Sequence, residues 1–403
     1  MRNLWVETWR TELQRLEEQD LLRTLRLSHP CGHGRRRIGE NEYIDLSSND
    51  YLGLANDPRI VAALHEGAER WGVGATASRM LAGHTEAHRA LEERLASLKG
   101  TEAALVYPSG FQANIGLFSG LAGRHDLVIA DRLCHASILD GIRLSGAKLE
   151  RFRHNDVAHL EAMLQSAGRE SIVATESVFS MEGDTAPLPE ILEIVTRYDA
   201  LLIVDEAHAT GIFGKQGAGM WEECHLPTGP DVPVILMGTI SKALGCQGGF
   251  VCGPRTLIDY LLNRSRSFIF STGMSPALAW AAVRALEIAV VEKERRQKVL
   301  HNAELLCSLV GHTPAKEPHT PIIPVLIGDA ERTMRISGRL LDRGILAGAI
   351  RPPSVPDGTS RLRLSVSAAH RPEDLRHAAG VVQEEIRTPE LWGRGSSPKL
   401  GGG

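Results

Sequence analysis

Two short segments of the chain carry side chains that could take part in chemistry. In LLIVDEAHATG an apolar run ends at Asp205 and His208 follows three residues later, whereas in GTISKALG small residues surround Lys242. A buried carboxylate can keep the nitrogen of a pyridine ring protonated, and a lysine amine can form a covalent link to a carbonyl group. Asp205 and Lys242 therefore predict a site for a pyridine-based cofactor, although a strand-end carboxylate can also cap a helix and most lysines are surface charges.

Two nucleotide-binding interpretations fail. The letters DEAH also occur in nucleic-acid helicases, but that function needs an upstream phosphate loop of the G-x-x-x-x-G-K-[ST] type, and the sequence has none. The segment GVGATAS, Gly72 to Ser78, imitates a dinucleotide fingerprint, yet a helix-like stretch precedes it instead of a strand. We therefore predict an ordinary loop at residues 72–78.

Further candidates follow other apolar runs. YPSGFQAN leads from a strand into a helix, whose first backbone N–H groups can bind a phosphate, and Gly110 lets the backbone come close. DRLCHASI places His135 where its imidazole could stack on an aromatic ring, although a lone histidine is more often structural. The other candidates are hydroxyl or carboxylate side chains after comparable runs: Glu176, Ser180, Thr239 and Ser241.

The elements that must position these residues alternate along the middle of the chain. Short apolar, β-rich runs alternate with helix-like segments, which indicates a mostly parallel α/β sheet covered on both faces. The carboxyl ends of parallel strands face one crevice, so residues at these ends are expected to converge. The predicted strands are 103–107, 127–130, 171–175, 201–205 and 234–237.

The remaining segments predict an arm and a smaller domain. Residues 5–28 place apolar side chains at helical spacing among charges, and a charged helix-like stretch at 291–305 precedes apolar runs at 322–327 and 362–366. The tail is rich in Gly, Ser and Pro, so we expect it to be disordered. The predicted regions are an N-terminal arm at 1–42, a large domain at 43–290, a small α+β C-terminal domain at 291–388 and the tail at 389–403.

Composition limits the partners and the compartment. Of the 403 residues 43% are apolar and 23% charged, and the net charge is −4, which is typical of a globular enzyme and offers no basic surface for nucleic acid. The six cysteines form no C-x-x-C pair, so neither a disulfide framework nor a metal site is predicted. An export signal and an apolar stretch of ~18 residues are both absent, so we expect a cytoplasmic protein that does not enter membranes.

Together the motifs resemble the α-oxoamine synthase family of pyridoxal 5′-phosphate (PLP) enzymes. The resemblance rests on SSNDYLGLA, PSGFQAN, DRLCHASI, HND at His154, TESVFSMEGD, DEAHATGIFG, TISKALG and STGMSP, and extends over about residues 20–385. It implies a PLP-dependent transferase of fold type I, with a large cofactor domain and a small C-terminal domain. It also implies a homodimer whose subunits share their active sites.

The resemblance further implies roles for individual residues. Lys242 would bind the cofactor covalently, Asp205 would contact its ring nitrogen, and His208 its phenolic oxygen. His135 would stack on the ring and, with Lys242 and Asp205, act in catalysis. The other cofactor-binding residues would be Gly110, Phe111, Glu176, Ser180, Thr239 and Thr272. The substrate-binding residues would be Arg23, Asn49, His135, Arg351, Ser354 and Arg363, with Asn49 and Arg363 at the carboxylate of the amino acid.

The implied reaction joins an amino acid to an acyl thioester with loss of carbon dioxide. The segment Ile350 to His370 resembles the branch that serves biotin biosynthesis, in which L-alanine reacts with a pimeloyl thioester of coenzyme A or acyl carrier protein. The glycine-using branches, 2-amino-3-ketobutyrate ligase and 5-aminolevulinate synthase, share the cofactor residues and remain alternatives, as does an aminotransferase. A non-catalytic scaffold of the same fold would lack Lys242. Residues 75–77, where the family has some glycines, and Ser354, where threonine would match, depart from the pattern and bear on acyl selectivity.

Overall fold

The computed structural model describes residues 4–168, 170–311 and 318–388, and it divides into two compact units. Unit 1 takes its described residues from 1–49, 181–183 and 298–403, and unit 2 consists of 50–180 and 184–297. The expected N-terminal arm thus falls in the same unit as the C-terminal segment. The tail predicted to be disordered, 389–403, lies outside the described residues.

The centre of unit 2 is a mostly parallel sheet, as predicted. Within the described residues its seven strands are, in spatial order, β4 (Ala103–Tyr107), β10 (Gly249–Gly253), β9 (Val234–Thr239), β8 (Leu201–Asp205), β7 (Ile172–Glu176), β5 (Leu127–Asp131) and β6 (Lys148–Phe152). β10 runs antiparallel to both neighbours, whereas the strands from β9 to β6 are parallel to one another. The carboxyl ends of β9, β8, β7 and β5 therefore lie along one edge of the sheet.

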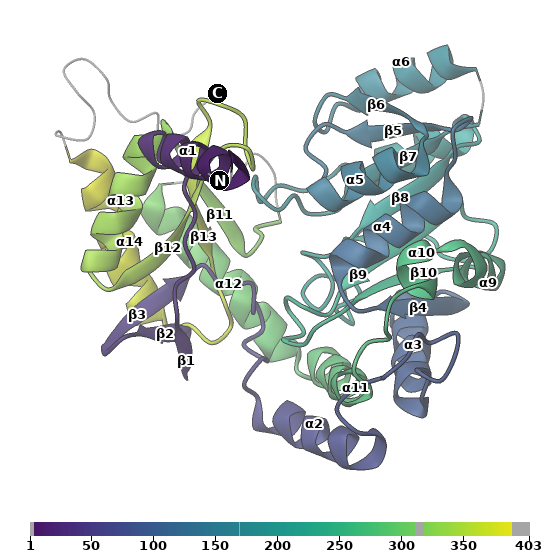
Figure 1. The fold of residues 1–403 in the computed structure, drawn as a ribbon, viewed down its shortest axis with the longest axis horizontal. Coiled ribbons are helices and arrows are strands. Elements are labelled where there is room, and N and C mark those ends of the chain that lie inside the picture. The colour runs from purple at the N-terminus through teal and green to yellow at the C-terminus, as the bar shows by residue number, and fades with distance from the viewer. Residues whose placement is uncertain (1–3, 169, 312–317, 389–403) are drawn as a thin grey trace. The chain divides into compact units, whose positions relative to one another are not determined.

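Helices pack against this sheet (Figure 1), and every residue of β4, β5 and β9 is buried, so both sheet faces are covered. The predicted loop at 72–78 is confirmed, because the helix before it ends at Trp71 and its C-cap Gly72 leaves the helical conformation with a φ of +80°. The helices of this unit are α2 (Pro58–Trp71), α3 (Glu86–Lys99), α4 (Gly110–Leu121), α5 (Ala136–Ser145), α6 (Val157–Ala167), α7 (Leu188–Arg197), α8 (Met220–Glu223), α9 (Arg255–Arg264), α10 (Arg266–Ile269) and α11 (Pro276–Val291).

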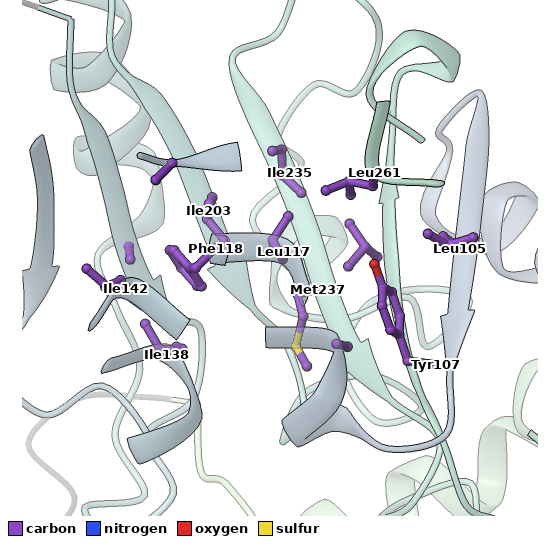
Figure 2. Packing of buried hydrophobic residues seen from close by; sticks show 14 of the residues in the cluster. Leu105, Tyr107, Leu117, Phe118, Ile138, Ile142, Ile203, Ile235, Met237 and Leu261 are labelled. Atoms are coloured by element: carbon purple, nitrogen blue, oxygen red, sulfur yellow. The ribbon is translucent and has the colours of Figure 1, made fainter. Parts of the chain in front are cut away.

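A continuous apolar core lies between the sheet and helices α4, α5 and α9. Figure 2 shows Phe118 of α4 among side chains of β8 and α5, and Tyr107 of β4 close to Leu261 of α9. Each fully buried side chain of this size contributes about 1.5–3 kcal/mol to folding. Because such a core resists deformation, the strand ends beside it have fixed positions.

Unit 1 contains a mixed sheet with helices of its own. Its strands are, in spatial order, β1 (His29–Gly32), β2 (Arg35–Ile38), β3 (Asn41–Leu46), β12 (Ile345–Ile350), β13 (Ser360–Ser365) and β11 (Ile322–Gly328). The parallel pairing of β3 with β12 joins the N-terminal hairpin to the C-terminal segment. Its helices are α1 (Leu4–Glu18), α13 (Ala330–Asp342) and α14 (Pro372–Arg387), while α12 (Lys293–Val310) continues from unit 2 into unit 1.

Helix α1 confirms the expected amphipathic helix only as far as Glu18, since residues 21–28 form no helix, and it buries none of its residues. Trp5 and Trp9 are 70% and 59% exposed. The apolar stripe of this helix therefore faces solvent in the single chain.

Candidate active site

A cavity of about 200 Å³ lies in unit 2 where the chain leaves β4, β5, β7, β8 and β9. It brings together most of the residues that the sequence predicts to hold the cofactor: Gly110, Phe111, His135, Glu176, Asp205, His208, Thr239 and Lys242. The lining residues that the sequence did not single out are Asn114, Ser137, Ala207 and Met237. Ser180 and Thr272 do not line the cavity; Ser180 is buried in the turn after β7, and Thr272 lies between α10 and α11.

Asp205 is a buried carboxylate that the surrounding chain holds in place. Its Oδ1 accepts the backbone N–H of Ala207 at 2.8 Å, and its Oδ2 accepts Nδ2 of Asn114 at 2.8 Å. Asn114 also donates to the Ser137 hydroxyl at 3.0 Å. Asn114 lies one helical turn beyond Gly110 on α4, and its position as a polar residue inside an apolar helix is the signal that could have identified it.

The Lys242 amine belongs to a chain of three hydrogen-bonded groups. Its Nζ lies 2.7 Å from Nε2 of His208, and Nδ1 of His208 lies 2.7 Å from the hydroxyl of Tyr51. Tyr51 is fully buried, so its hydroxyl has a fixed direction. This arrangement orients His208 and gives the lysine amine a partner with which it can share a proton.

His135 occupies the N-cap of α5. The ring Nδ1 of His135 accepts the backbone N–H of Ser137 at 3.2 Å. The backbone N–H of His135 donates to Oε1 of Glu176 at 2.6 Å. Burial lowers the pKa of His135; the charge of Asp205 raises it, and that of Lys242 lowers it. The net effect lowers the pKa, which favours the neutral ring, and because Nδ1 accepts a backbone N–H, the proton of the neutral ring is assigned to Nε2.

One side of the cavity suits an anion. The N-cap Ser109 begins α4, and the first N–H groups of a helix have no partner within the helix. The hydroxyls of Thr239 and Ser241 lie 3.0 Å apart beside it in the lining. A Cβ on Gly249 would lie 2.5 Å from Cα of Gly110, so β10 needs glycine there to approach the start of the helix.

Apart from His135, which lines the cavity in unit 2, the predicted substrate residues form two groups in unit 1. Arg363 on β13 is buried and donates to Oδ1 of Asn49 at 3.0 Å and to the hydroxyl of Ser365 at 2.7 Å. Arg351, just after β12, donates to the backbone oxygen of Leu22, next to Arg23.

The second group concentrates positive charge. Nη2 of Arg23 lies 3.4 Å from the backbone oxygen of Pro352, and the N–H of Ser354 donates to the backbone oxygen of Arg351 at 3.1 Å. Burial and then the charge of Arg23 lower the pKa of Arg351, whereas the smaller effect of the Asp20 carboxylate raises it. Nε of Arg351 is buried and has no hydrogen-bond partner among the described residues. Two like charges and an unsatisfied donor are the features of a site that an anion would stabilise.

Comparisons with known proteins match this chain over most of its length. The family of class I and II aminotransferases matches residues 41–382. A Desulforudis audaxviator protein with the provisional name 8-amino-7-oxononanoate synthase is 43% identical over 390 residues, which cover 96% of this chain and 100% of the relative. The structure of a serine palmitoyltransferase from S. paucimobilis with bound PLP and myriocin has a TM-score of 0.88 at 31% identity, covering 96% and 99% of the two chains. The structure of 8-amino-7-oxononanoate synthase from Francisella tularensis has a TM-score of 0.74 at 27% identity, and the match covers 85% of this chain and 98% of that one.

Proposed function

Because the chain belongs to the class I and II aminotransferase family and, within it, to the α-oxoamine synthases, we propose that it joins L-alanine to a pimeloyl thioester. The reaction releases carbon dioxide and the thiol, and yields 8-amino-7-oxononanoate for biotin biosynthesis. The observation that carries this proposal is a cavity whose lining includes both Lys242 and the buried carboxylate of Asp205. The names of the relatives support the choice of substrates.

The cofactor is pyridoxal 5′-phosphate, which when bound withdraws electrons from the carbon next to the nitrogen of the amino acid. The donor set of the cavity fits this group. The carboxylate of Asp205 suits a protonated ring nitrogen, and the amine of Lys242 suits the aldehyde. The start of α4 and the hydroxyl of Thr239 suit the phosphate.

The other steps of the reaction depend on side chains that bind the substrates and transfer protons. The amine of Lys242 removes the proton from the α-carbon of the amino acid, and His208, oriented by Tyr51, keeps that amine in place. His135 donates its Nε2–H to the carbonyl oxygen of the thioester, which makes the carbonyl carbon a better electrophile. Arg363, held by Asn49, binds the carboxylate of the amino acid.

The Arg23–Arg351 group favours an acyl chain that ends in a carboxylate. A pimeloyl chain carries such a group, whereas a palmitoyl chain ends in a methyl group that could not compensate two positive charges. The likeness to serine palmitoyltransferase makes serine with a long acyl thioester the second candidate. The two arginines argue against it, because burying a hydrocarbon end beside Arg351 would leave its Nε unsatisfied.

The proposed assembly is a cytoplasmic homodimer with shared active sites. Loop 72–83 is tied to the segment after α10, since the hydroxyl of Ser78 donates to the oxygen of Ile269 at 2.7 Å and Gly273 N–H to the oxygen of Ala77 at 2.9 Å. Large apolar side chains on these segments and at the cavity are exposed: Val73, Met80, Leu81, Phe111 and Phe270. A second subunit would cover them. None of the helices that the structure describes combines the length and the apolar content of a membrane-spanning segment.

Product analysis with a matrix of substrates tests the proposed function. The purified holoenzyme is incubated with L-alanine, glycine or L-serine and with pimeloyl, heptanoyl or palmitoyl coenzyme A, and products are identified by mass spectrometry. We expect turnover with L-alanine and the pimeloyl thioester. Arg23→Gln should raise KM for the pimeloyl thioester by roughly 10-fold and leave the heptanoyl reaction unchanged, because a charge-assisted hydrogen bond is lost. Turnover with serine and palmitoyl coenzyme A alone would replace the proposal with the second candidate, and glycine alone with the glycine-using branches.

A further inference from the structure

His154 lies between two carboxylates that come from different parts of unit 2. Its Nδ1 is 3.0 Å from Oδ1 of Asp131, and its Nε2 is 2.8 Å from Oδ2 of Asp184. An ionised carboxylate oxygen only accepts hydrogen bonds, so both ring nitrogens must donate at the same time. A neutral imidazole has one N–H, and only the imidazolium ion has two. With both carboxylates ionised, this geometry therefore requires a cation at this position.

The surroundings of the ring favour the same state. The side chain of His154 is 20% exposed, and its ring packs edge-on against Phe179 with centroids 4.4 Å apart. Burial lowers the pKa of His154, but the hydrogen bonds and charges of Asp131 and Asp184 outweigh it and raise the pKa to about 10. The imidazolium thus persists over the pH range in which the enzyme would work.

One end of this cross-link holds the turn that carries His135. Asp131 is the last residue of β5; its Oδ1 also accepts the backbone N–H of Leu133 at 2.8 Å, and its backbone oxygen accepts that of Cys134 at 3.1 Å. The next residue is His135, which lines the cavity. The carboxylate that binds His154 therefore also shapes the turn that brings His135 to the cavity.

The other end holds the hairpin that follows β7 and contains Ser180. The backbone oxygen of Asp184 accepts the N–H of Phe179 at 3.0 Å, and Val178 forms a bridge with Thr185. The carboxylate of Asp184 reaches back to His154 across the base of this hairpin.

Asn155 reinforces the cross-link from the next position. Its φ is +53°, a left-handed conformation that asparagine tolerates better than most residues. Its N–H donates to Oδ2 of Asp131 at 2.9 Å, and its Nδ2 donates to Oδ2 of Asp184 at 3.2 Å and to the oxygen of Thr185 at 3.2 Å. His154 and Asn155 therefore both contact the same two carboxylates and together form one cross-link.

We propose that His154 is a positioning residue, a cationic cross-link that fixes the His135 turn relative to the Ser180 hairpin and so sets the geometry of the cofactor cavity. The proposal rests on the proposed function, because it takes His135, which lines the cavity, as a residue that faces the cofactor and the thioester, and Ser180 as a predicted cofactor-binding residue. His154 touches neither of these groups itself. It acts only through the two segments that it joins.

The first measurement is the protonation state of the ring. Nitrogen NMR of the holoenzyme labelled in histidine should show both ring nitrogens of His154 protonated at pH 8, with the signal assigned by its loss in His154→Gln. A neutral ring at pH 8 would overturn the proposal. This result is independent of whether the enzyme condenses any thioester, so it separates a failure of the cross-link from a failure of the proposed function.

Amide hydrogen exchange of the holoenzyme tests what the cross-link holds. His154→Gln should speed exchange both in residues 131–137 and in residues 177–186, whereas Asp184→Ala should do so in 177–186 alone. His159→Gln is the matched control, since this imidazole lies five residues further along and accepts the N–H of Arg153 without touching either carboxylate. Unchanged exchange in His154→Gln, or a uniform increase throughout the chain, would show that the residue positions neither segment.

Kinetics connect the cross-link to the reaction. His154→Gln should lower kcat by roughly 10- to 100-fold, the scale that a displacement of about 1 Å in an active site produces. KM for L-alanine should stay within about twofold, because the Asn49–Arg363 pair is not part of the cross-link. His159→Gln should match the wild type in both constants. A variant that loses stability but keeps kcat would assign His154 a purely structural role and contradict the proposal.

Discussion

The buried ion pair behind the active site gives the sharpest prediction about stability. Lys99 ends α3, and its Nζ lies 2.5 Å from Oε2 of Glu206, with the two side chains 1% and 0% exposed. The ammonium also donates to the hydroxyl of Thr210 at 2.9 Å and to the backbone oxygen of Ala218, so its three protons have acceptors. Glu206 and Thr210 delimit the turn that follows Asp205. Lys99 therefore anchors the turn from which Asp205 and His208 reach the cavity.

We expect Lys99→Met to lower the free energy of unfolding by about 3–5 kcal/mol, because it leaves the carboxylate of Glu206 buried without a counter-charge. Changing Glu206→Gln in the same chain removes that charge, while the amide oxygen can still accept the N–H of Trp221, which lies 2.8 Å from Oε1 of Glu206. The double variant should therefore be more stable than Lys99→Met alone. Guanidinium unfolding of the holoenzyme, followed by circular dichroism and by cofactor absorbance, measures both differences.

Two results would refute this reasoning. A loss below about 1 kcal/mol for Lys99→Met would mean that the pair contributes no more than an exposed salt bridge. Additive losses in the double variant would mean that the two side chains do not compensate each other.

Three further predictions follow from single contacts. The pKa of His154 rises from 6.5 to about 10 on folding, so the native state binds more protons between these values; this stabilisation is complete below pH 6.5 and is lost as pH rises through about 10. Unfolding free energies across this range should fall with a slope of up to about 1.4 kcal/mol per pH unit in the wild type and less in His154→Gln. Asn114→Leu removes a donor from Asp205 and should cost about 1–3 kcal/mol and weaken PLP binding in a titration; equal affinity would show that the contact is dispensable. Gly249→Ala should cost about 1–3 kcal/mol in thermal unfolding, because its Cβ would meet Cα of Gly110, and an unchanged midpoint would contradict that clash.

The sequence predicted those parts of the fold whose signal is local. The runs 103–107 and 201–205 match β4 and β8 at both ends, because each is an apolar stretch buried on both faces and bounded by polar or turn-forming residues. β6 was not predicted: KLERF lies at the edge of the sheet, and most of its side chains remain partly exposed. β10 was missed as well, because its glycines obscure the β-strand pattern.

The same difference between local and long-range signals explains which site residues could be identified from the sequence. Asp205 and Lys242 were recognisable because Asp205 ends one predicted strand and Lys242 follows another within a few residues, where the topology dictates their positions. Tyr51 could not be assigned to His208 from the sequence, because their contact joins residues that are 157 positions apart. His154 was visible only as a letter in a motif, and its importance depends on two carboxylates that meet it in space.

The most direct test of the account is to identify the lysine that binds PLP. Borohydride reduction of the holoenzyme makes the link between a lysine amine and the cofactor permanent, and peptide mapping by mass spectrometry then locates it. We expect the phosphopyridoxyl group on Lys242, and no labelled peptide in Lys242→Ala. A label on another lysine, or no label in the wild type, would contradict the role that we assign to the cavity.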